Sequence, residues 1–124
     1  MTYSRYYVCD LQVHSPADRM QGYGDIGGRE PNLNFARRFI QAHVEAGVQV
    51  IAVTDHNTVD WYPVLNEAGQ EFGVAVFPGV EISVNGCHLL VIWERSPLGF
   101  ELGQQFLTKL WKPGEDRFFP NGDA

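Results

Sequence analysis

The stretch VQVIAVTDHN (residues 48–57) decides the fold class of this chain. Its first six residues form a nearly continuous apolar run, which is typical of a parallel strand that is buried on both faces. The run ends abruptly at four polar residues, Thr54, Asp55, His56 and Asn57. We therefore expect a buried parallel strand that carries chemically versatile side chains at its carboxyl end.

Strand and helix patterns alternate on either side of this run. Residues 6–13 and 74–77 are rich in β-branched and aromatic residues and predict strands. Residues 62–72 predict a helix, and an earlier helix is expected to begin at Asn32 or Asn34. The earlier helix has apolar residues at helical spacing and a glycine stop, at Ala36, Phe39, Ile40, Val44 and Gly47. Because a parallel neighbour requires a crossover, this order predicts an α/β fold with a parallel sheet.

The second half of the chain predicts a hairpin. Pro78-Gly79 is expected to break the chain after the third strand. Two further strand patterns, residues 81–84 and 87–93, flank Asn85-Gly86, a dipeptide typical of tight hairpin turns. A last helix is expected from about residue 100 to residue 111, where aromatic and leucine residues recur. Strands four and five are thus expected to be antiparallel.

Composition and charge exclude some classes of function. The chain has 124 residues, of which 44% are hydrophobic, and this suffices for one compact core. Its net charge of −6 provides no positive field for a polyanion, so nucleic-acid binding is expected only with help from another component. Cys9 and Cys87 form no disulfide framework, and no apolar run fits a signal peptide or a membrane span. We therefore predict a cytoplasmic protein without membrane attachment.

Polar side chains gather at the carboxyl ends of the predicted strands. They are Asp10, Gln12, His14, Asp55, His56 and Glu81, and His88 opens the return strand of the hairpin. Strand alternation is expected to place Asp10, Gln12 and His14 on one face. Because parallel strands end at the same edge of a sheet, these imidazoles and carboxylates are expected to converge on a Zn, Mn or Fe ion.

Four segments that carry these residues resemble the successive motifs of the polymerase and histidinol phosphatase (PHP) superfamily. They are DLQVHS (10–15), VIAVTDHNT (50–58), FPGVEIS (77–83) and HLLVIW (88–93). The resemblance implies that residues 1–112 form the N-terminal half of the family's (β/α) barrel, a partial barrel of PHP type, with an irregular tail at 113–124. The chain also resembles the variant of this domain that precedes a chromosome-maintenance-like ATPase.

The resemblance further implies a metal-dependent phosphoesterase. Its metal positions would be Gln12, His14, His56, Glu81 and His88, and its catalytic residues would be Asp55 and His56. Divalent ions (Mn, Zn or Fe) would activate a water that attacks a phosphate mono- or diester, including nucleotide-related ones. From their positions, we also expect Asp10 to hold a ligand imidazole and Arg29 or Arg37 to bind a substrate phosphate.

The sequence departs from the family pattern in three places. Gln12 stands where the family has its leading histidine, and an amide oxygen binds zinc or iron weakly, so one metal position is weakened or reassigned. The aspartate that follows the family's first motif has Asp18 or Asp25 as its match here. The length is also about half of the ~250 residues of a typical (β/α) barrel. We therefore expect self-association, or a partner chain such as an ATPase, to complete the barrel.

A second interpretation fits the same departures. In it, the chain is a degenerate or truncated PHP-like platform that binds a partner chain without catalysis. His43, on the inner stripe of the first predicted helix, is expected to be a structural histidine under either interpretation. Hydrolysis of a phosphodiester with Mn, lost when His56 is replaced, would favour the enzyme over the platform.

Overall fold

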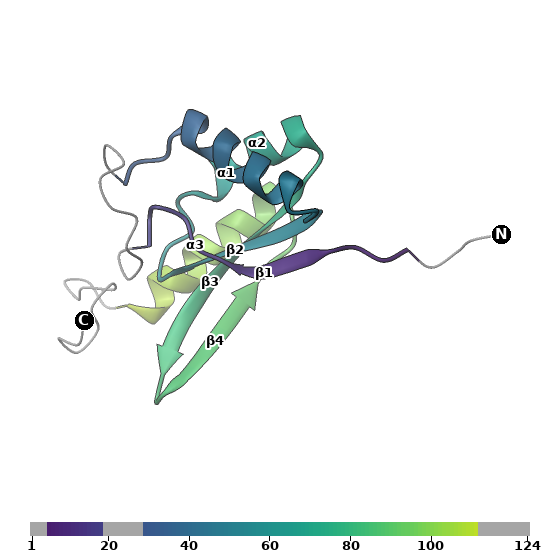
Figure 1. The fold of residues 1–124 in the computed structure, drawn as a ribbon. Coiled ribbons are helices and arrows are strands. Elements are labelled where there is room, and N and C mark those ends of the chain that lie inside the picture. The colour runs from purple at the N-terminus through teal and green to yellow at the C-terminus, as the bar shows by residue number, and fades with distance from the viewer. Residues whose placement is uncertain (1–4, 19–28, 112–124) are drawn as a thin grey trace.

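The structure, a computed structural model, describes residues 5–18 and 29–111 of the chain (Figure 1). Its strands are β1 (Cys9–Val13), β2 (Val50–His56), β3 (Ala75–Val84) and β4 (Cys87–Ile92). Its helices are α1 (Leu33–Glu45), α2 (Tyr62–Phe72) and α3 (Pro97–Leu110). The predicted tail at 113–124 and Asp25 lie outside the described residues.

The four strands form one mixed sheet in the order β1-β2-β3-β4. The first three strands are parallel, and β4 returns antiparallel to β3. Helices α1 and α2 make the two crossovers that parallel neighbours require. The sheet curls, so that β4 approaches β2. The fold is therefore an α/β half-barrel with a hairpin at one edge, and the predicted α/β class with parallel strands is confirmed.

Alternate residues of β2 and β3 face opposite sides of the sheet. Ile51, Val53 and Val76 pack with Ile40 of α1 and Leu65 of α2 in the main hydrophobic core. On the other face, four cross-strand pairs of β2 and β3 follow one another along the strands. They are Val50 with Ala75, Ala52 with Phe77, Thr54 with Gly79, and His56 with Glu81. The helices thus cover one face. On the opposite face, the row of cross-strand pairs ends in two polar residues at the carboxyl ends of the strands.

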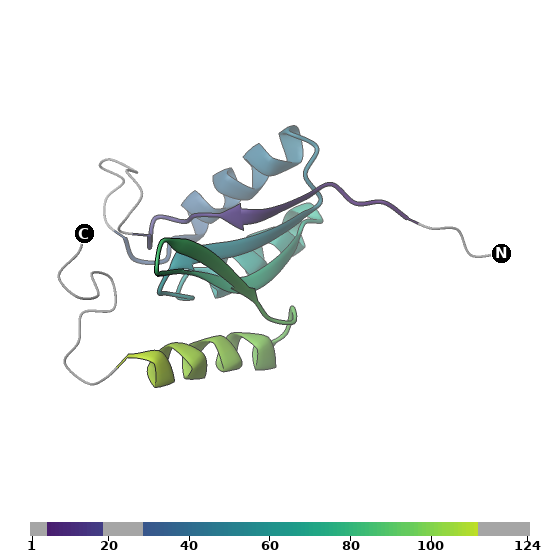
Figure 2. The ribbon, with the colours of Figure 1, turned by 90° about the horizontal axis from the view of Figure 1, so that it is seen from below.

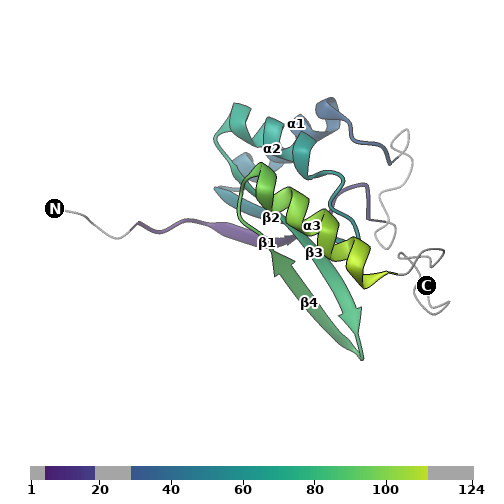
Figure 3. The ribbon, with the colours of Figure 1, turned by 180° about the vertical axis from the view of Figure 1, so that it is seen from behind.

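Helix α3 builds a second, smaller core at the β3 side of the sheet. Leu107 packs there against Val59, Val80 and Ile82, and Trp93 contacts the same cluster. Seen from behind, α3 crosses β3 (Figure 3). Seen from below, α3 and α1 stand apart with the strands between them (Figure 2). The hairpin is therefore anchored to the domain by its own helix.

The capping signals explain where the helices begin and end. Asn32 caps α1, because its side-chain oxygen accepts the backbone N–H of Phe35 at 3.0 Å. Gly73 ends α2 in the left-handed conformation, with φ of 76°. The last helix begins at Pro97, three residues before the predicted start, because Ser96 provides its cap. Among these helices of the described residues, none combines the length and apolar character required to cross a membrane.

The predicted chain break at Pro78-Gly79 is wrong, because β3 continues through both residues. The carbonyl of Pro78 accepts the N–H of Trp93 at 2.9 Å, so the missing N–H of this proline lies on the β4 side, where the β4 ladder ends. Gly79 allows a close approach, since a Cβ there would lie 2.9 Å from the carbonyl oxygen of Val91. The described residues therefore form four strands, whereas five were expected.

Strand ends also differ from the prediction. The first strand begins at Cys9 instead of residue 6, and β2 runs on through the polar residues to His56. The β1–β2 register is irregular between Asp10 and Val13. Gln12 and His14 lie on one side as expected, since both reach Glu81, whereas the register irregularity separates Asp10 from them.

Candidate metal centre

Two imidazoles stack at the carboxyl ends of β1 and β2. His14 follows β1 directly, and His56 is the last residue of β2. Their ring centroids lie 5.4 Å apart, and the ring planes differ by 9°. The parallel pairing of the strands brings the two histidines together, although they are far apart in the sequence. The two ring planes are therefore nearly parallel.

The Nδ1 atoms of both rings face one carboxylate, that of Asp18. Each Nδ1 lies 2.8 Å from the same oxygen, Oδ2. This oxygen also accepts the backbone N–H of His56 at 2.9 Å. Asp18 is fully buried. A buried carboxylate is thus satisfied by donors from the end of β2 and from the loop after β1.

The Nε2 atoms of both rings face a second carboxylate, that of Glu81 on β3. The distances are 3.3 Å from His14 Nε2 to Oε2 and 3.6 Å from His56 Nε2 to Oε1. Ligand atoms about 2.0–2.2 Å from a shared metal lie roughly 3–3.5 Å from one another. His14, His56 and Glu81 therefore form a set that could hold a metal ion.

The charges of this cluster favour a cation. Asp18 and Glu81 are buried carboxylates that both face His14 and His56, and Glu81 also faces the exposed His88. Burying a charge without a counter-charge is costly. A divalent ion bound at the Nε2 side would offset the charge of the buried Glu81 carboxylate.

Gln12 and His88 approach the Glu81 carboxylate from the solvent side. The side-chain amide of Gln12 donates from Nε2 to Oε2 of Glu81 at 3.4 Å. The Nδ1 atom of His88 lies 3.0 Å from Oε1 of Glu81 and 3.1 Å from the hydroxyl of Ser83. His88 is mostly exposed, at 65% of its side chain. Metal ligation by Gln12 and His88 stays a prediction.

Asp55 is held by Ser15. Its carboxylate accepts the Ser15 backbone N–H at 2.6 Å and the Ser15 hydroxyl at 2.5 Å. Burial raises the pKa of Asp55 to about 7, opposed by the two Ser15 hydrogen bonds, while the nearby Asp18 carboxylate raises it further and His56 lowers it. Asp55 also lies within reach of a second possible metal set, with His14 and Asp18.

The remaining predicted residues have protein partners. The carboxylate of Asp10 accepts the backbone N–H of Gln12 at 3.2 Å. Arg29 donates to the carbonyls of residues 16 and 18 at 2.9 Å each, and Arg37 forms a two-pronged ion pair with Glu71 of α2. Substrate binding by either arginine stays a prediction. His43 lies on α1 with its Nδ1 2.8 Å from the carbonyl of Phe39, which fits the structural role expected for it.

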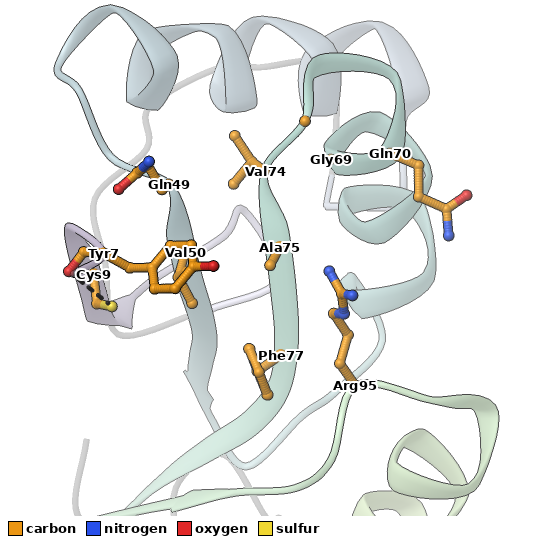
Figure 4. Close-up of a pocket in the computed structure, with 11 residues that line it drawn as sticks. Tyr7, Cys9, Gln49, Val50, Gly69, Gln70, Val74, Ala75, Phe77 and Arg95 are labelled. Carbon is orange, nitrogen blue, oxygen red and sulfur yellow. Dashed lines mark hydrogen bonds between the residues drawn. The ribbon is translucent and has the colours of Figure 1, made fainter. Parts of the chain in front are cut away.

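A cavity of about 640 Å³ lies at the amino ends of the same strands (Figure 4). Tyr7, Val50, Ala75 and Phe77 give it a largely apolar lining, and Arg95 stands at one side. Val50 and Ala75 are six residues before His56 and Glu81, which corresponds to roughly 20 Å along a strand. This cavity is therefore separate from the metal centre.

The part of the site that sequence reasoning weighted least is Asp18. In the sequence, Asp18 is only one of two matches to a family aspartate. The signal was local, because Asp18 follows His14 by four residues. Its contact with His56 depends on the fold.

Comparisons with known proteins do not assign this chain. No protein-family model matches the sequence, and no curated protein matches it. The function is therefore inferred from the geometry of the cluster and from the motifs that carry its residues.

Proposed function

We propose that this chain is a metal-dependent phosphoesterase module of the PHP kind, which hydrolyses a phosphate mono- or diester. The observation that supports this proposal is the meeting of the Nε2 atoms of His14 and His56 with the Glu81 carboxylate at the carboxyl ends of parallel strands. Open α/β sheets bind their ligands at that edge. The order of the four motifs gives independent support, since each carries a residue of this cluster or of its rim.

A divalent ion, when bound, would lower the pKa of a coordinated water and stabilise the negative charge that develops at phosphorus. In the proposal, His14, His56 and Glu81 hold this ion. Glu81 accepts from Gln12, and His88 reaches the same carboxylate, so these two side chains line the approach for a substrate. A metal of either Mn, Zn or Fe type fits a set of imidazoles and carboxylates.

Asp55 has the chemistry of a proton carrier in this site. Its pKa of about 7 lies near neutral pH, where a general acid or base is most effective. It is buried, and its carboxylate accepts both the hydroxyl and the backbone N–H of Ser15. The proposed role of Asp55 is therefore to hold and exchange a proton behind the metal ligands.

Metal binding and hydrolysis test this proposal. We expect the protein to bind Mn or Zn and to hydrolyse bis(p-nitrophenyl) phosphate in their presence. His56→Ala should lower the rate by a factor of about 100 or more, because it removes one imidazole ligand. His43→Ala is the matched control, since His43 lies on α1 and contacts Phe39 instead of the cluster. Equal rates for both variants would exclude the proposed site.

The second candidate function is a platform that binds a partner chain. The supporting observation is the edge strand β1, whose Cys9 and Leu11 are exposed, together with the half-buried apolar floor of Val50, Ala75 and Phe77. An unpaired strand edge with apolar side chains invites another strand. Self-association, or a partner such as an ATPase that completes the barrel, is part of both proposals.

The two candidates separate in one pair of measurements. Sedimentation of the wild type and of a Leu11→Lys variant reports association through β1, and the hydrolysis assay reports catalysis. Association with no metal-dependent hydrolysis would favour the platform. Hydrolysis that survives Leu11→Lys would favour an enzyme whose site is complete in each chain.

A further inference from the structure

Among the residues that the structure describes, three nitrogens lie within hydrogen-bond distance of the oxygen Oδ2 of Asp18. They are the two Nδ1 atoms of His14 and His56 and the backbone N–H of His56, at 2.8, 2.8 and 2.9 Å. A carboxylate can only accept hydrogen bonds. Each ring must therefore carry a proton on Nδ1 in order to make its contact with Asp18.

The nitrogen that carries this proton determines whether the other nitrogen of the ring can bind a metal ion. A neutral imidazole has one N–H, and its second nitrogen has a free lone pair. With the proton on Nδ1, the lone pair is on Nε2, which in both rings faces Glu81. The parallel stacking, with 9° between the planes, aims the two lone pairs at the same region.

We propose that Asp18 is the positioning residue of the site: it fixes His14 and His56 in the Nδ1–H tautomer, so that both Nε2 atoms bind one divalent ion together with Glu81. This inference rests on the proposed metal-dependent function and deepens it. In this arrangement Asp18 does not itself bind the ion. It acts through the two imidazoles, as carboxylates behind metal-bound histidines commonly do.

The loop that carries Asp18 is tied to the domain without any metal. The Asp18 backbone N–H donates to the carbonyl of Ser15 at 3.0 Å. The guanidinium of Arg29 donates to the Asp18 carbonyl at 2.9 Å, and the Arg29 carbonyl accepts the indole N–H of Trp61 at 2.9 Å. Trp61 is almost completely buried. Asp18 is thus held in place before a metal arrives, as a positioning role requires.

Direct ligation by Asp18 is the competing arrangement, because Asp18 also belongs to a possible metal set with His14 and Asp55. An ion held by Asp18 and Asp55 would bind the His14 ring through a lone pair on Nδ1, the nitrogen that faces Asp18. Bound through Nδ1, the neutral His14 ring would carry its proton on Nε2 and could not also offer that nitrogen to an ion at Glu81. The nitrogen that binds the metal therefore distinguishes the two arrangements.

Nitrogen-15 NMR of the histidine-labelled protein tests the proposal. The metal-free wild type, at a pH where the rings are neutral, should show a protonated Nδ1 and an unprotonated Nε2 for His14 and His56. Addition of Zn²⁺ alone should shift the Nε2 signals of both rings. His14→Gln and His56→Gln assign the signals. A protonated Nε2 in either metal-free ring, or zinc on Nδ1, would overturn the role of Asp18.

Asp18→Ala supplies the matched perturbation. His14 and His56 should then lose the fixed tautomer, and Zn²⁺ affinity should fall by about 10–100-fold. His43 is the internal control, because its Nδ1 contacts the carbonyl of Phe39 and should stay protonated in the variant. An unchanged tautomer of His14 and His56 in a folded Asp18→Ala variant would count against the proposal. Asp18→Asn keeps a side-chain oxygen that can accept hydrogen bonds from the rings, so its Zn²⁺ affinity should be higher than that of Asp18→Ala. If Asp18→Ala does not fold, the wild-type spectra still decide.

These outcomes are independent of the phosphoesterase assay. Zinc bound through both Nε2 atoms without any hydrolysis would remove the proposed activity and leave the role of Asp18 intact. Hydrolysis with zinc bound through Nδ1 would do the reverse.

Discussion

The carboxylate of Glu81 turns one oxygen toward each of the two stacked imidazoles, at 3.3 Å from His14 Nε2 and 3.6 Å from His56 Nε2. Glu81 is buried in β3, while His14 follows β1, two strands away in the sheet. This relation joins three strands at one point. It also makes the charge of Glu81 the feature on which metal binding depends most directly.

Replacing Glu81 by Gln should remove most of the stabilisation that a metal gives. At a free zinc concentration about a hundred times Kd, binding should stabilise the wild type by about 2.7 kcal/mol. The variant keeps a side chain of the same shape but loses the charge, so we expect less than about 0.5 kcal/mol. Urea unfolding with and without zinc measures this. Glu71→Gln, at the exposed ion pair with Arg37, is the control and should keep the full effect.

Gln12→His should strengthen metal binding. The Gln12 side chain already reaches Glu81 at 3.4 Å, and an imidazole is a better ligand for zinc than an amide. We expect Zn²⁺ affinity to rise by about tenfold, measured by competition with a chelator. Gln49→His, at the amino end of the sheet beside Val8, is the matched control and should leave the affinity unchanged. A weaker affinity for the Gln12 variant would mean that this position does not face the ion.

Asp55 should make the stability of the metal-free protein depend on pH. Burial raises the pKa of Asp55 from 3.8 to about 7, so the folded state holds this proton more tightly than the unfolded state. Its favourable contribution is complete below pH 3.8 and is lost as the pH rises through about 7. The unfolding free energy of the wild type, relative to Asp55→Asn, should therefore fall over this range by ~1 kcal/mol or more. Parallel pH profiles of the two proteins in urea unfolding would contradict the prediction.

Gly79→Ala should destabilise the fold more than Gly103→Ala. A Cβ at Gly79 would meet the Val91 carbonyl oxygen at 2.9 Å and Cγ2 of Thr54 at 3.0 Å, and the backbone contact cannot give way easily. We expect a loss of about 1–3 kcal/mol. At Gly103 the nearest atom is a side-chain methyl of Val59 at 3.2 Å, and alanine favours the helix, so the net change should be within about 1 kcal/mol. Thermal or urea unfolding of both variants measures the difference.

Much of the fold could be predicted from the sequence because its signals are local. Asn32, Gly73 and Asn85-Gly86 fix a helix start, a helix end and a hairpin turn through their own side chains or φ angles. The apolar run at 48–53 predicted a buried parallel strand, and β2 is that strand. Pro78 misled the prediction, because whether its missing N–H matters depends on which neighbouring strand lies on that side.

The residues of the candidate site were also visible in the sequence, as polar side chains that follow strands. The sequence could not specify which carboxylate contacts which imidazole. Strand alternation predicted one face for Asp10, Gln12 and His14, but the irregular register of β1 changes that arrangement. Asp10 contacts the backbone of Gln12, and the carboxylate behind the two imidazoles is that of Asp18.

The sequence by itself determined the α/β pattern, the hairpin and the edge of the sheet at which the polar residues gather, because periodicity, caps and turns depend on neighbours in the chain. Only the tertiary structure decided that Asp18 and Glu81 face opposite nitrogens of His14 and His56. The physical reason is that these contacts depend on the register of β1, β2 and β3 and on the path of the loop after β1. Such relations between distant segments are set by packing and hydrogen bonding of the whole domain.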